Sequence, residues 1–395
     1  MTTINSIDRL DASGKRVLVR VDFNVPVKDG RVTDDTRIRA ALPTIERLIE
    51  QGGRVVLMSH RGRPSGEGFE EDFSLKPAAQ RLSQLVDAPV RIADDIAGPD
   101  ALAKAEALAP GEILVVENLR FDQREKRNDP GFCAELARLG EVYVNDAFGT
   151  AHRAHASTAG VAGLLPAYAG YLMEREVSTL TGMLACPDRP FTAVLGGSKV
   201  SDKIQVIDAL MEKCDTLVIG GGMCFTFLAA QGYEVGSSLC ERDFVERAAQ
   251  MIEAAREKGV QLLLPVDVVA ADRFAEDADA VTVGVDSIPE DRMGLDIGPK
   301  TAEIYGEACR KAATVFWNGP MGVFEMDSFA AGTRAVAEAI AENRAGVTII
   351  GGGDSVAAVN KFDLADRMTF ISTGGGASME LVEGRELPGV AALYR

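Results

Sequence analysis

Short apolar runs alternate with amphipathic segments along the whole chain. The first run, residues 15–25, is predicted to form a strand with Val17, Val19, Val21 and Phe23 on one face and polar residues on the other. Later runs are rich in Val, Ile and Leu, which is typical of buried parallel strands. They occupy residues 54–60, 112–120, 141–148, 191–197, 215–222, 261–268, 313–320, 347–353 and 368–376.

Helical periodicity fills the intervals between these runs. Residues 44–53 are amphipathic and end in two glycines, as expected just past a helix. Apolar side chains also recur at helical spacing in the middle of the chain, at Met173, Val177, Leu180 and Leu184, before Pro187 and Pro190. The pattern predicts two Rossmann-like α/β domains, each a three-layer sandwich with a parallel sheet, joined by a helix.

Length and composition agree with a two-domain globular protein. The 395 residues exceed one ordinary core, with 46% hydrophobic and 26% charged residues. No apolar run approaches the roughly 18 residues of a membrane span, and the N-terminus lacks a signal-peptide pattern, so we expect a cytoplasmic protein. The six cysteines are far apart, which favours free thiols over disulfides or a zinc site.

The charge is unevenly distributed. The net charge is −17, but residues 1–172 carry 22 basic against 25 acidic side chains, whereas the remainder carries 20 against 34. Nucleic acid and anionic membranes are therefore not expected as partners. An anionic ligand would need a local basic cluster, and the first half of the chain is the better place for it.

Polar and basic residues follow the predicted strands of the first half. Ligands of open parallel sheets bind beyond the carboxyl ends of the strands, so these positions should converge. They are Asp22, Asn24, His60, Arg61, Arg63, Arg120, His152 and Arg153, and Arg37 begins the helix after the first strand. Any one arginine could be a solvated surface charge, but their recurrence at equivalent positions favours a pocket for a small, highly charged anion.

Glycine-rich turns follow the predicted strands of the second half instead. They span residues 196–203, 220–223, 318–325, 351–355 and 372–378. Glycines allow close approach of the backbone, and helix N-termini after them favour phosphate groups. No Walker A element or GxGxxG fingerprint is present, which argues against a P-loop NTPase and a Rossmann dehydrogenase.

Charged residues among these glycines suggest a nucleotide site. Lys199 and Lys203 are four apart at the start of a predicted helix, where they would share a face and reach one phosphate chain. Asp354 could hold Mg²⁺ bound to a nucleotide, or alternatively cap a helix. Glu325 could accept hydrogen bonds from ribose hydroxyls, or lie at the rim of the site. The residues thus indicate an enzyme of two lobes, one binding an anion and the other the phosphates of a nucleotide. A charged group would be transferred between the two when the lobes close.

Eight motifs resemble those of the phosphoglycerate kinase family, in the family's order and over almost the whole chain. They are RVDFNVP (20–26), SHRGRP (59–64), ENLRF (117–121), DAFGTAHRAHAS (146–157), GGSKVSDKI (196–204), WNGPMGVFE (317–325), GGGDS (351–355) and STGGGAS (372–378). One departure is Cys224–Phe225, where the family often has smaller or tyrosyl residues. The resemblance implies reversible phosphoryl transfer from 1,3-bisphosphoglycerate to Mg·ADP, giving 3-phosphoglycerate and ATP in glycolysis or gluconeogenesis.

The resemblance also implies roles for individual residues. Asp22, Asn24, Arg37, His60, Arg63, Arg120 and Arg153 would bind the glycerate ligand. Lys203, Gly294, Glu325 and Gly352–Ser355 would bind the nucleotide, with Asp354 on the magnesium and Gly352, Gly353 and Ser355 lining the loop. Arg37, Lys199 and the amides around Gly375 (Gly374–Gly376) would surround the phosphoryl group in transit.

The expected layout places the active-site cleft between two domains. Residues 1–172 would bind 3-phosphoglycerate, 173–187 would form the connecting helix, and 188–380 would bind the nucleotide; residues 381–395 would return to the N-terminal domain. We expect a monomer with hinge-bending closure. The rival hypotheses are a kinase for another carboxylate or carbamate, and a two-lobed anion-binding protein.

The histidines around Arg153 raise a separate question, since His152 and His155 could suggest a metal site or a catalytic pair. The only other histidine is His60, so a metal site lacks ligands. The acceptor oxygens are already ionised, and phosphoryl transfer therefore needs positioning and charge rather than a base. We expect Arg153 to bind the anion, His152 to support it and His155 to be structural.

Overall fold

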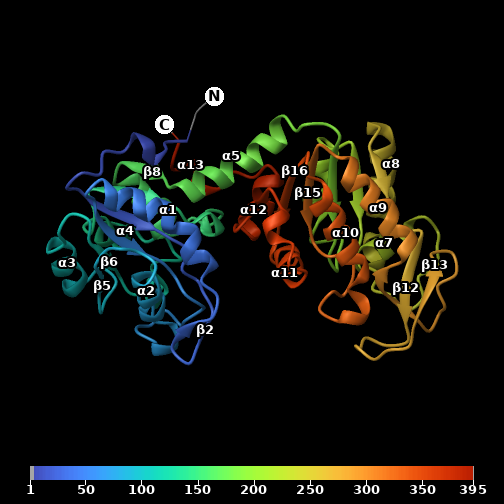
Figure 1. The fold of residues 1–395 in the computed structure, drawn as a ribbon, viewed down its shortest axis with the longest axis horizontal. Coiled ribbons are helices and arrows are strands. Elements are labelled where there is room, and N and C mark those ends of the chain that lie inside the picture. Colours follow the sequence, from blue (N-terminus) through green and yellow to red (C-terminus); the bar gives the residue numbers. More distant parts are fainter. Residues whose placement is uncertain (1–3, 395) are drawn as a thin grey trace. The chain divides into compact units, whose positions relative to one another are not determined.

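The computed structural model describes residues 4–394 and divides into two compact units (Figure 1). The first unit extends to Thr179 and includes the chain from Glu386 onward, and the second comprises Leu180–Arg385. The helix α5 (Tyr171–Ala185) passes from one unit to the other, two residues upstream of the predicted 173–187. Within the described residues, no helix combines the length and apolar composition needed to cross a membrane.

A six-stranded parallel sheet forms the centre of the first unit. Its order is β5 (Val90–Ile92), β6 (Ile113–Val115), β4 (Arg54–Met58), β1 (Arg16–Arg20), β7 (Val142–Asn145) and β8 (Ala167–Ala169). The helices are α1 (Thr36–Glu50), α2 (Lys76–Ser83), α3 (Pro99–Glu106), α4 (Pro130–Ala137) and the short α13 (Pro388–Ala391), with a hairpin of β2 (Val27–Lys28) and β3 (Arg31–Val32). Val17 and Val19 pack in one buried cluster with α1 and α2 side chains such as Ile45 and Leu82.

The first strand is shorter than the sequence predicts. Its alternation of apolar residues continues to Phe23, and those side chains are buried in the same cluster, but the strand ends at Arg20. The amide of Val21 still bonds to the Met58 carbonyl, whereas the amide of Phe23 bonds to the Ser59 hydroxyl at 2.8 Å. A side chain therefore replaces the neighbouring strand as the partner, and the backbone leaves the sheet just before Asp22.

The second unit is built around another parallel sheet. Its order is β11 (Gln261–Leu263), β10 (Thr216–Ile219), β9 (Phe191–Leu195), β15 (Thr314–Asn318), β16 (Val347–Gly351) and β17 (Phe370–Ile371). The helices are α6 (Ile204–Met211), α7 (Cys224–Ala230), α8 (Val245–Lys258), α9 (Pro299–Lys311), α10 (Ala331–Glu342), α11 (Gly353–Lys361) and α12 (Gly376–Val382). Trp317 on β15 is fully buried and packs in one cluster with side chains of α9, α10 and α11. The predicted α/β class with parallel sheets is confirmed.

One predicted strand of the second unit is wrong in detail. The run 261–268 is not a single parallel strand, because the chain leaves the sheet after β11 and Pro265 interrupts the run. Residues from Asp267 belong to β12 (Asp267–Ala271), which lies between β13 (Ala280–Gly284) and β14 (Met293–Ile297) in an antiparallel sheet. Apolar runs alone do not distinguish these two environments.

The last residues of the chain pack on the first unit. The amide of Gly389 donates to the Ala151 carbonyl at 2.8 Å, and the Leu393 carbonyl accepts from the Asn5 amide at 3.0 Å.

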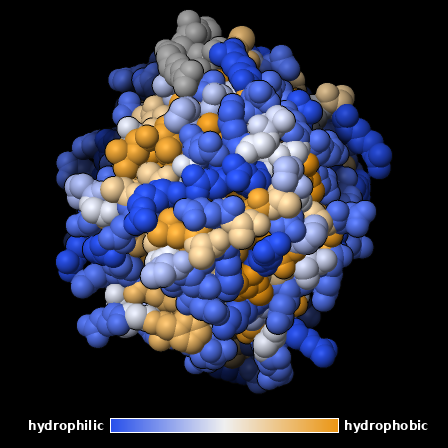
Figure 2. Space-filling view, turned by 90° about the vertical axis from the view of Figure 1, so that its left-hand side faces the viewer, coloured by the Kyte–Doolittle hydropathy of each residue, from blue (hydrophilic) through white to orange (hydrophobic). Residues whose placement is uncertain are grey.

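Figure 2 shows the face on the left-hand side of Figure 1. Hydrophobic residues form separate groups on this face, with hydrophilic residues between them.

Candidate functional sites

In the first unit, the loops after the parallel strands bring the predicted anion-binding residues together. The sheet order reverses at β1, with β4 on one side and β7 on the other, and such switch points are the usual ligand sites of open sheets. Arg37, in the first turn of α1, forms an ion pair with the buried carboxylate of Asp22. Asn24 accepts from the Gly62 amide at 2.9 Å, and Arg120 donates to the Gly62 carbonyl at 2.6 Å.

Two further predicted arginines are exposed. Arg63 lies on the loop after β4. Arg153 follows β7, and its Nε donates to Nε2 of His152 at 3.1 Å, so the two side chains are in contact. His155 is only partly exposed and lies 3.7 Å from the buried carboxylate of Glu125, so it faces the interior of the unit.

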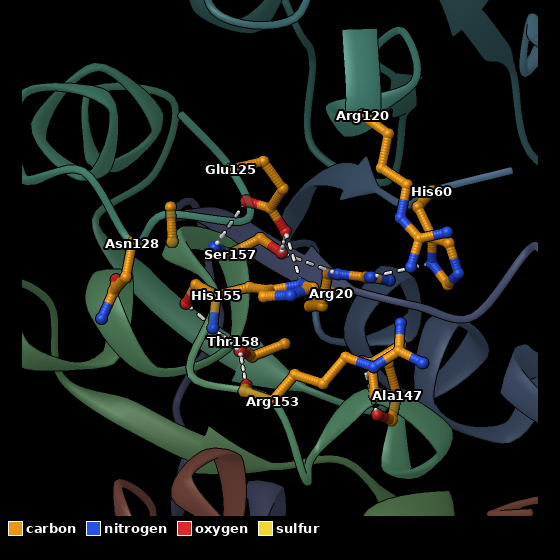
Figure 3. Close-up of polar contacts among 12 residues, drawn as sticks. Arg20, His60, Arg120, Glu125, Asn128, Ala147, Arg153, His155, Ser157 and Thr158 are labelled. Carbon is orange, nitrogen blue, oxygen red and sulfur yellow. Dashed lines mark hydrogen bonds and ion pairs between the residues drawn. The ribbon is translucent and has the colours of Figure 1, made fainter. Parts of the chain in front are cut away.

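Arg20 is a residue of this site that the sequence analysis does not select. The alternating pattern places it on the polar face of a strand, yet it is 1% exposed. Its Nε donates to Ser157 Oγ at 2.9 Å, and its NH2 group lies 3.0 Å from His60 Nδ1 (Figure 3). The signal that could identify it is its position directly before the RVDFNVP loop, at the carboxyl end of the central strand.

Accumulated positive charge changes the ionisation of this site. Burial, reinforced by Arg20, Arg120 and Arg153, lowers the pKa of His60 well below its usual value. Burial, with Arg153 and Arg20, lowers the pKa of Arg120 to about 10. His60 is therefore neutral at pH 7 while the arginines remain charged, so the pocket is cationic and should favour an anion.

In the second unit, one asparagine holds together the glycine-rich loops. Asn318 ends β15, next to β9, at the point where the sheet order reverses. Its carbonyl accepts from the Gly196 amide at 2.9 Å, and its Nδ2 donates to the Gly351 carbonyl at 2.8 Å. Its Oδ1 accepts from Nζ of Lys203. In the sequence, Asn318 stands out only as part of the motif at 317–325, because its role depends on three segments that meet in the fold.

These loops enclose a polar cavity of about 260 Å³. Its lining is Gly196, Gly197, Lys203, Asn318, Gly319, Gly352, Gly353, Asp354, Ser355, Gly375, Gly376 and Met379. Gly352 and Gly375 have φ of +87° and +53°, a conformation that side chains disfavour. Burial lowers the pKa of Lys203, while Asp354 and Asp202 oppose that shift. Several glycines and one lysine thus line a space of the size of a few phosphate groups.

A second, more apolar cavity of about 420 Å³ adjoins the first, since Gly197 and Asp354 line both. Phe225, Gly294 and Glu325 are among its lining residues. A Cβ on Gly294 would overlap the ring of Phe225, so the aromatic side chain at this position requires glycine opposite it. Glu325 is exposed at the wall, as a residue contacting a sugar would be.

The prediction that Lys199 and Lys203 share a helical face is wrong. The helix α6 begins only at Ile204, with Lys203 as its N-cap, and Lys199 lies in the preceding loop. The loop is irregular because Gly197 has φ of +119° and the Lys203 amide closes a turn on the Val200 carbonyl. Asp354 is not a helix cap either, since Gly352 holds that position in α11.

Comparison with known proteins identifies the family. The family model described as "Phosphoglycerate kinase" matches residues 7–385. The chain belongs to the phosphoglycerate kinase family. A phosphoglycerate kinase of Moorella thermoacetica is 58% identical over 384 residues, which cover 97% of each sequence.

Solved structures of phosphoglycerate kinases share the fold. The structure of the enzyme from Coxiella burnetii has a TM-score of 0.91 at 45% identity, and that from Pyrococcus horikoshii OT3 has 0.83 at 34%. Each comparison covers 99% of this chain and 98% of the other. This member of the phosphoglycerate kinase family is therefore a kinase.

Proposed function

We propose that the two sites divide the substrates of phosphoglycerate kinase between them, the glycerate ligand on the first unit and the nucleotide on the second. Membership of the family makes the reaction the reversible transfer of the acyl phosphate of 1,3-bisphosphoglycerate to ADP, giving 3-phosphoglycerate and ATP. The observation that carries the assignment is the contrast between a cationic pocket and a glycine-lined phosphate cavity, each at the switch point of its own sheet.

The glycerate ligand would bind to the side chains that follow β1, β4, β6 and β7. Its carboxylate and phosphate are strong acceptors, and arginine offers several donors in a fixed geometry. Those residues are Asp22, Asn24, Arg37, His60, Arg63, Arg120 and Arg153. Arg120 is held by the Gly62 carbonyl, so part of its orientation is fixed before a ligand arrives.

The nucleotide would place its base in the apolar cavity and its phosphates in the polar one. Lys203 and the N-terminus of α11, with Gly352, Gly353 and Ser355, would contact the phosphates. Gly294 would line the base and Glu325 would accept from the ribose. Asn318 would hold Lys203 in place, because it bonds to the lysine and to the loops after β9 and β16.

The site fits a magnesium ion bound to the nucleotide. Asp354 is an exposed carboxylate in the first turn of α11, and it lines both cavities where phosphate oxygens would meet it. Mg²⁺ prefers one or two carboxylates together with substrate phosphates. When bound, the ion would neutralise charge on the phosphate chain.

Three groups would stabilise the transferred phosphoryl: Arg37, Lys199 and the amides around Gly375. The acceptor is an ionised oxygen, so these residues orient the reactants and offset negative charge rather than move a proton. Lys199 is exposed on its loop, and Arg37 is partly exposed beside Asp22, so both side chains can contact a ligand.

A coupled assay of ATP turnover tests the proposal. With Mg²⁺, 3-phosphoglycerate should support turnover, whereas acetate and carbamate should not. Turnover with acetate or carbamate at a comparable rate would favour the rival kinase, and failure of ATP to bind in calorimetry would favour an anion-binding protein.

We also propose that the chain acts as a monomer in the cytoplasm. The six cysteines are all free thiols, four of them buried, which suits a reducing compartment. Light scattering should give a mass near the 42.0 kDa of one chain. A dimer mass at micromolar concentration would contradict the monomer.

A further inference from the structure

A line of four polar side chains crosses the interior of the first unit, from Glu125 through Ser157 and Arg20 to His60 (Figure 3). We propose that Glu125 is a positioning residue for the glycerate pocket. Acting through Ser157 and Arg20, it fixes His60 as a neutral imidazole that carries its proton on Nε2 and donates it to the ligand. This inference rests on the proposed role of His60 in glycerate binding.

The direction of the hydrogen bonds follows from the donors available. A guanidinium has no acceptor, so Arg20 donates to both Ser157 Oγ and His60 Nδ1, at 2.9 and 3.0 Å. The Ser157 hydroxyl has one proton, which it gives to Glu125 Oε1 at 2.6 Å. The direction of each bond is then fixed: Arg20 donates to Ser157, and Ser157 donates to Glu125.

The hydrogen bond from Arg20 also fixes the tautomer of His60. Its Nδ1 must be unprotonated to accept from Arg20, so the ring proton of the neutral imidazole is on Nε2. Burial and the surrounding arginines lower the pKa of His60, which keeps the ring neutral at pH 7. His60 is therefore a hydrogen-bond donor of defined orientation rather than a further cation in the pocket.

Glu125 is the carboxylate that this arrangement requires. Arg20 is 1% exposed, and a buried charge is costly unless it is paired. The two carboxylates that stabilise the charged form of Arg20 are Glu125 and Asp22, but Asp22 is already ion-paired with Arg37. Glu125 is also 1% exposed and makes its side-chain hydrogen bonds with Ser157. Burial raises the pKa of its carboxyl, whereas Arg20 and the two Ser157 donors oppose that shift, so Arg20 and Glu125 each stabilise the charged form of the other.

The backbone around Glu125 holds the line in place. The Ser157 amide donates to Glu125 Oε2 at 3.0 Å, and the Glu125 carbonyl accepts from the Ala156 amide at the same distance. The hydroxyl of Tyr143 on β7 donates to the Ser157 carbonyl at 2.8 Å. Because these backbone bonds do not depend on the charge of Glu125, a substitution that removes that charge should affect the pocket through Arg20 and should leave the loop at 156–157 in place.

Glu125→Gln removes the charge and keeps the shape. The NH2 group of glutamine would face either the amide or the hydroxyl of Ser157, both of which donate to Glu125 in the wild type. Arg20 would also lose the carboxylate that balances its charge. We expect the KM for 3-phosphoglycerate to rise about tenfold, with the KM for ATP changed by less than about twofold. Ser157→Ala, which removes only the linking hydroxyl, should act in the same direction and serves as a second variant if Glu125→Gln does not fold.

Nitrogen NMR of the histidines gives a readout that a purely structural role would not change. The chain has only three histidines, so His60 can be assigned with a His60→Gln variant. Wild type should show His60 as the Nε2–H tautomer, and Glu125→Gln should show a mixture of the two neutral tautomers. Glu135→Gln is the matched control, because Glu135 pairs with Arg124 at a partly exposed position on α4 and should alter neither readout.

The outcomes separate this inference from the proposed function. An unchanged His60 tautomer in a folded Glu125→Gln protein would overturn it, as would an altered tautomer with an unchanged KM for 3-phosphoglycerate. The KM of His60→Gln tests the ligand contact by itself. If that KM equals the wild-type value, the glycerate role of His60 fails, whatever the spectra show.

Discussion

The cationic side chains of the two sites differ in how far burial and hydrogen bonds fix their orientation. Arg20 is enclosed and hydrogen-bonded on several sides, Arg120 is bonded to a backbone carbonyl, and Lys199 is exposed on a loop. A buried, hydrogen-bonded side chain keeps its orientation whether or not a ligand is present. An exposed lysine takes one orientation only when an anionic ligand binds to it. This difference should be visible in which kinetic constant each substitution changes.

Arg37→Ala and Lys199→Ala should lower kcat by about 10²–10³ while changing KM much less. Both side chains are proposed to act on charge that develops in the transition state, and loss of one such donor costs roughly 2.7–4 kcal/mol. Steady-state kinetics with each substrate varied would measure this. A raised KM with an intact kcat in both variants would contradict the role.

Arg63→Ala and Arg120→Ala should instead raise the KM for 3-phosphoglycerate, by about tenfold or more. These residues are proposed to hold the phosphate that is not transferred, which is bound equally in the ground and transition states. The same kinetics provide the measurement, with the KM for ATP as the internal control. An unchanged KM for 3-phosphoglycerate in both variants would exclude this contact.

Sequence motifs predict the charged residues that point into the loops, because their type and spacing are visible in one dimension. They do not predict Arg20, Glu125 or Asn318 as parts of a site. Arg20 and Glu125 are 105 positions apart, and what joins them is a hydroxyl from a third segment. The prediction that Lys199 lies on a helix is wrong because the backbone after β9 is irregular. Gly197 has a positive φ, and α6 begins only at Ile204.

The strands and helices of both units follow the sequence periodicity closely, but their ends do not. β1 stops where Ser59 supplies a side-chain partner, and the run after β11 is divided by Pro265. Both boundaries depend on contacts made by residues distant in sequence or on the chain leaving the sheet. Hydrophobic periodicity predicts which residues are buried. It does not show at which residue the backbone stops bonding to the neighbouring strand.

A buried carboxylate at the start of α10 should make the second unit sensitive to pH. Asp296 on β14 accepts from the Gly332 amide at 2.7 Å and the Ile297 amide at 2.9 Å, yet burial raises its pKa to about 7. Because the folded-state pKa lies above the unfolded value, ionisation costs stability as pH rises from about 4 to 7, and the full cost is present above that.

Wild type should therefore gain about 1 kcal/mol of unfolding free energy from Asp296 when the pH falls from 8 to 6. Asp296→Asn should lack this gain, because it cannot take up the proton. Denaturant unfolding of both proteins at the two pH values gives the comparison. Equal pH dependence in wild type and variant would show that Asp296 does not titrate in this range.

At the scale of the whole molecule, each unit carries only part of what the reaction needs. The first has the cationic pocket and the second has the phosphate cavity, and α5 links them covalently. Transfer requires the reacting oxygens to come within a few ångströms of phosphorus. We therefore expect a closing motion of the two units about α5 when both ligands are bound.

Small-angle scattering should show a smaller radius of gyration with 3-phosphoglycerate and a nucleotide together than with either alone. We expect closure to need both ligands, because each ligand binds to only one unit and a ligand shifts a conformational equilibrium only through its different affinity for the two states. The single-ligand samples are the control. The same radius in all three liganded samples would contradict ligand-dependent closure.

The chain has one tryptophan, and its location gives the second unit an optical signal of its own. Trp317 is fully buried, donates its indole N–H to the Gly319 carbonyl at 2.7 Å and immediately precedes Asn318. Intrinsic fluorescence should therefore respond to ADP, which would perturb the Lys203–Asn318 contact, and stay constant with 3-phosphoglycerate alone. A titration with each ligand would measure nucleotide affinity without any added dye, and an equal response to both would contradict the division of substrates between the units.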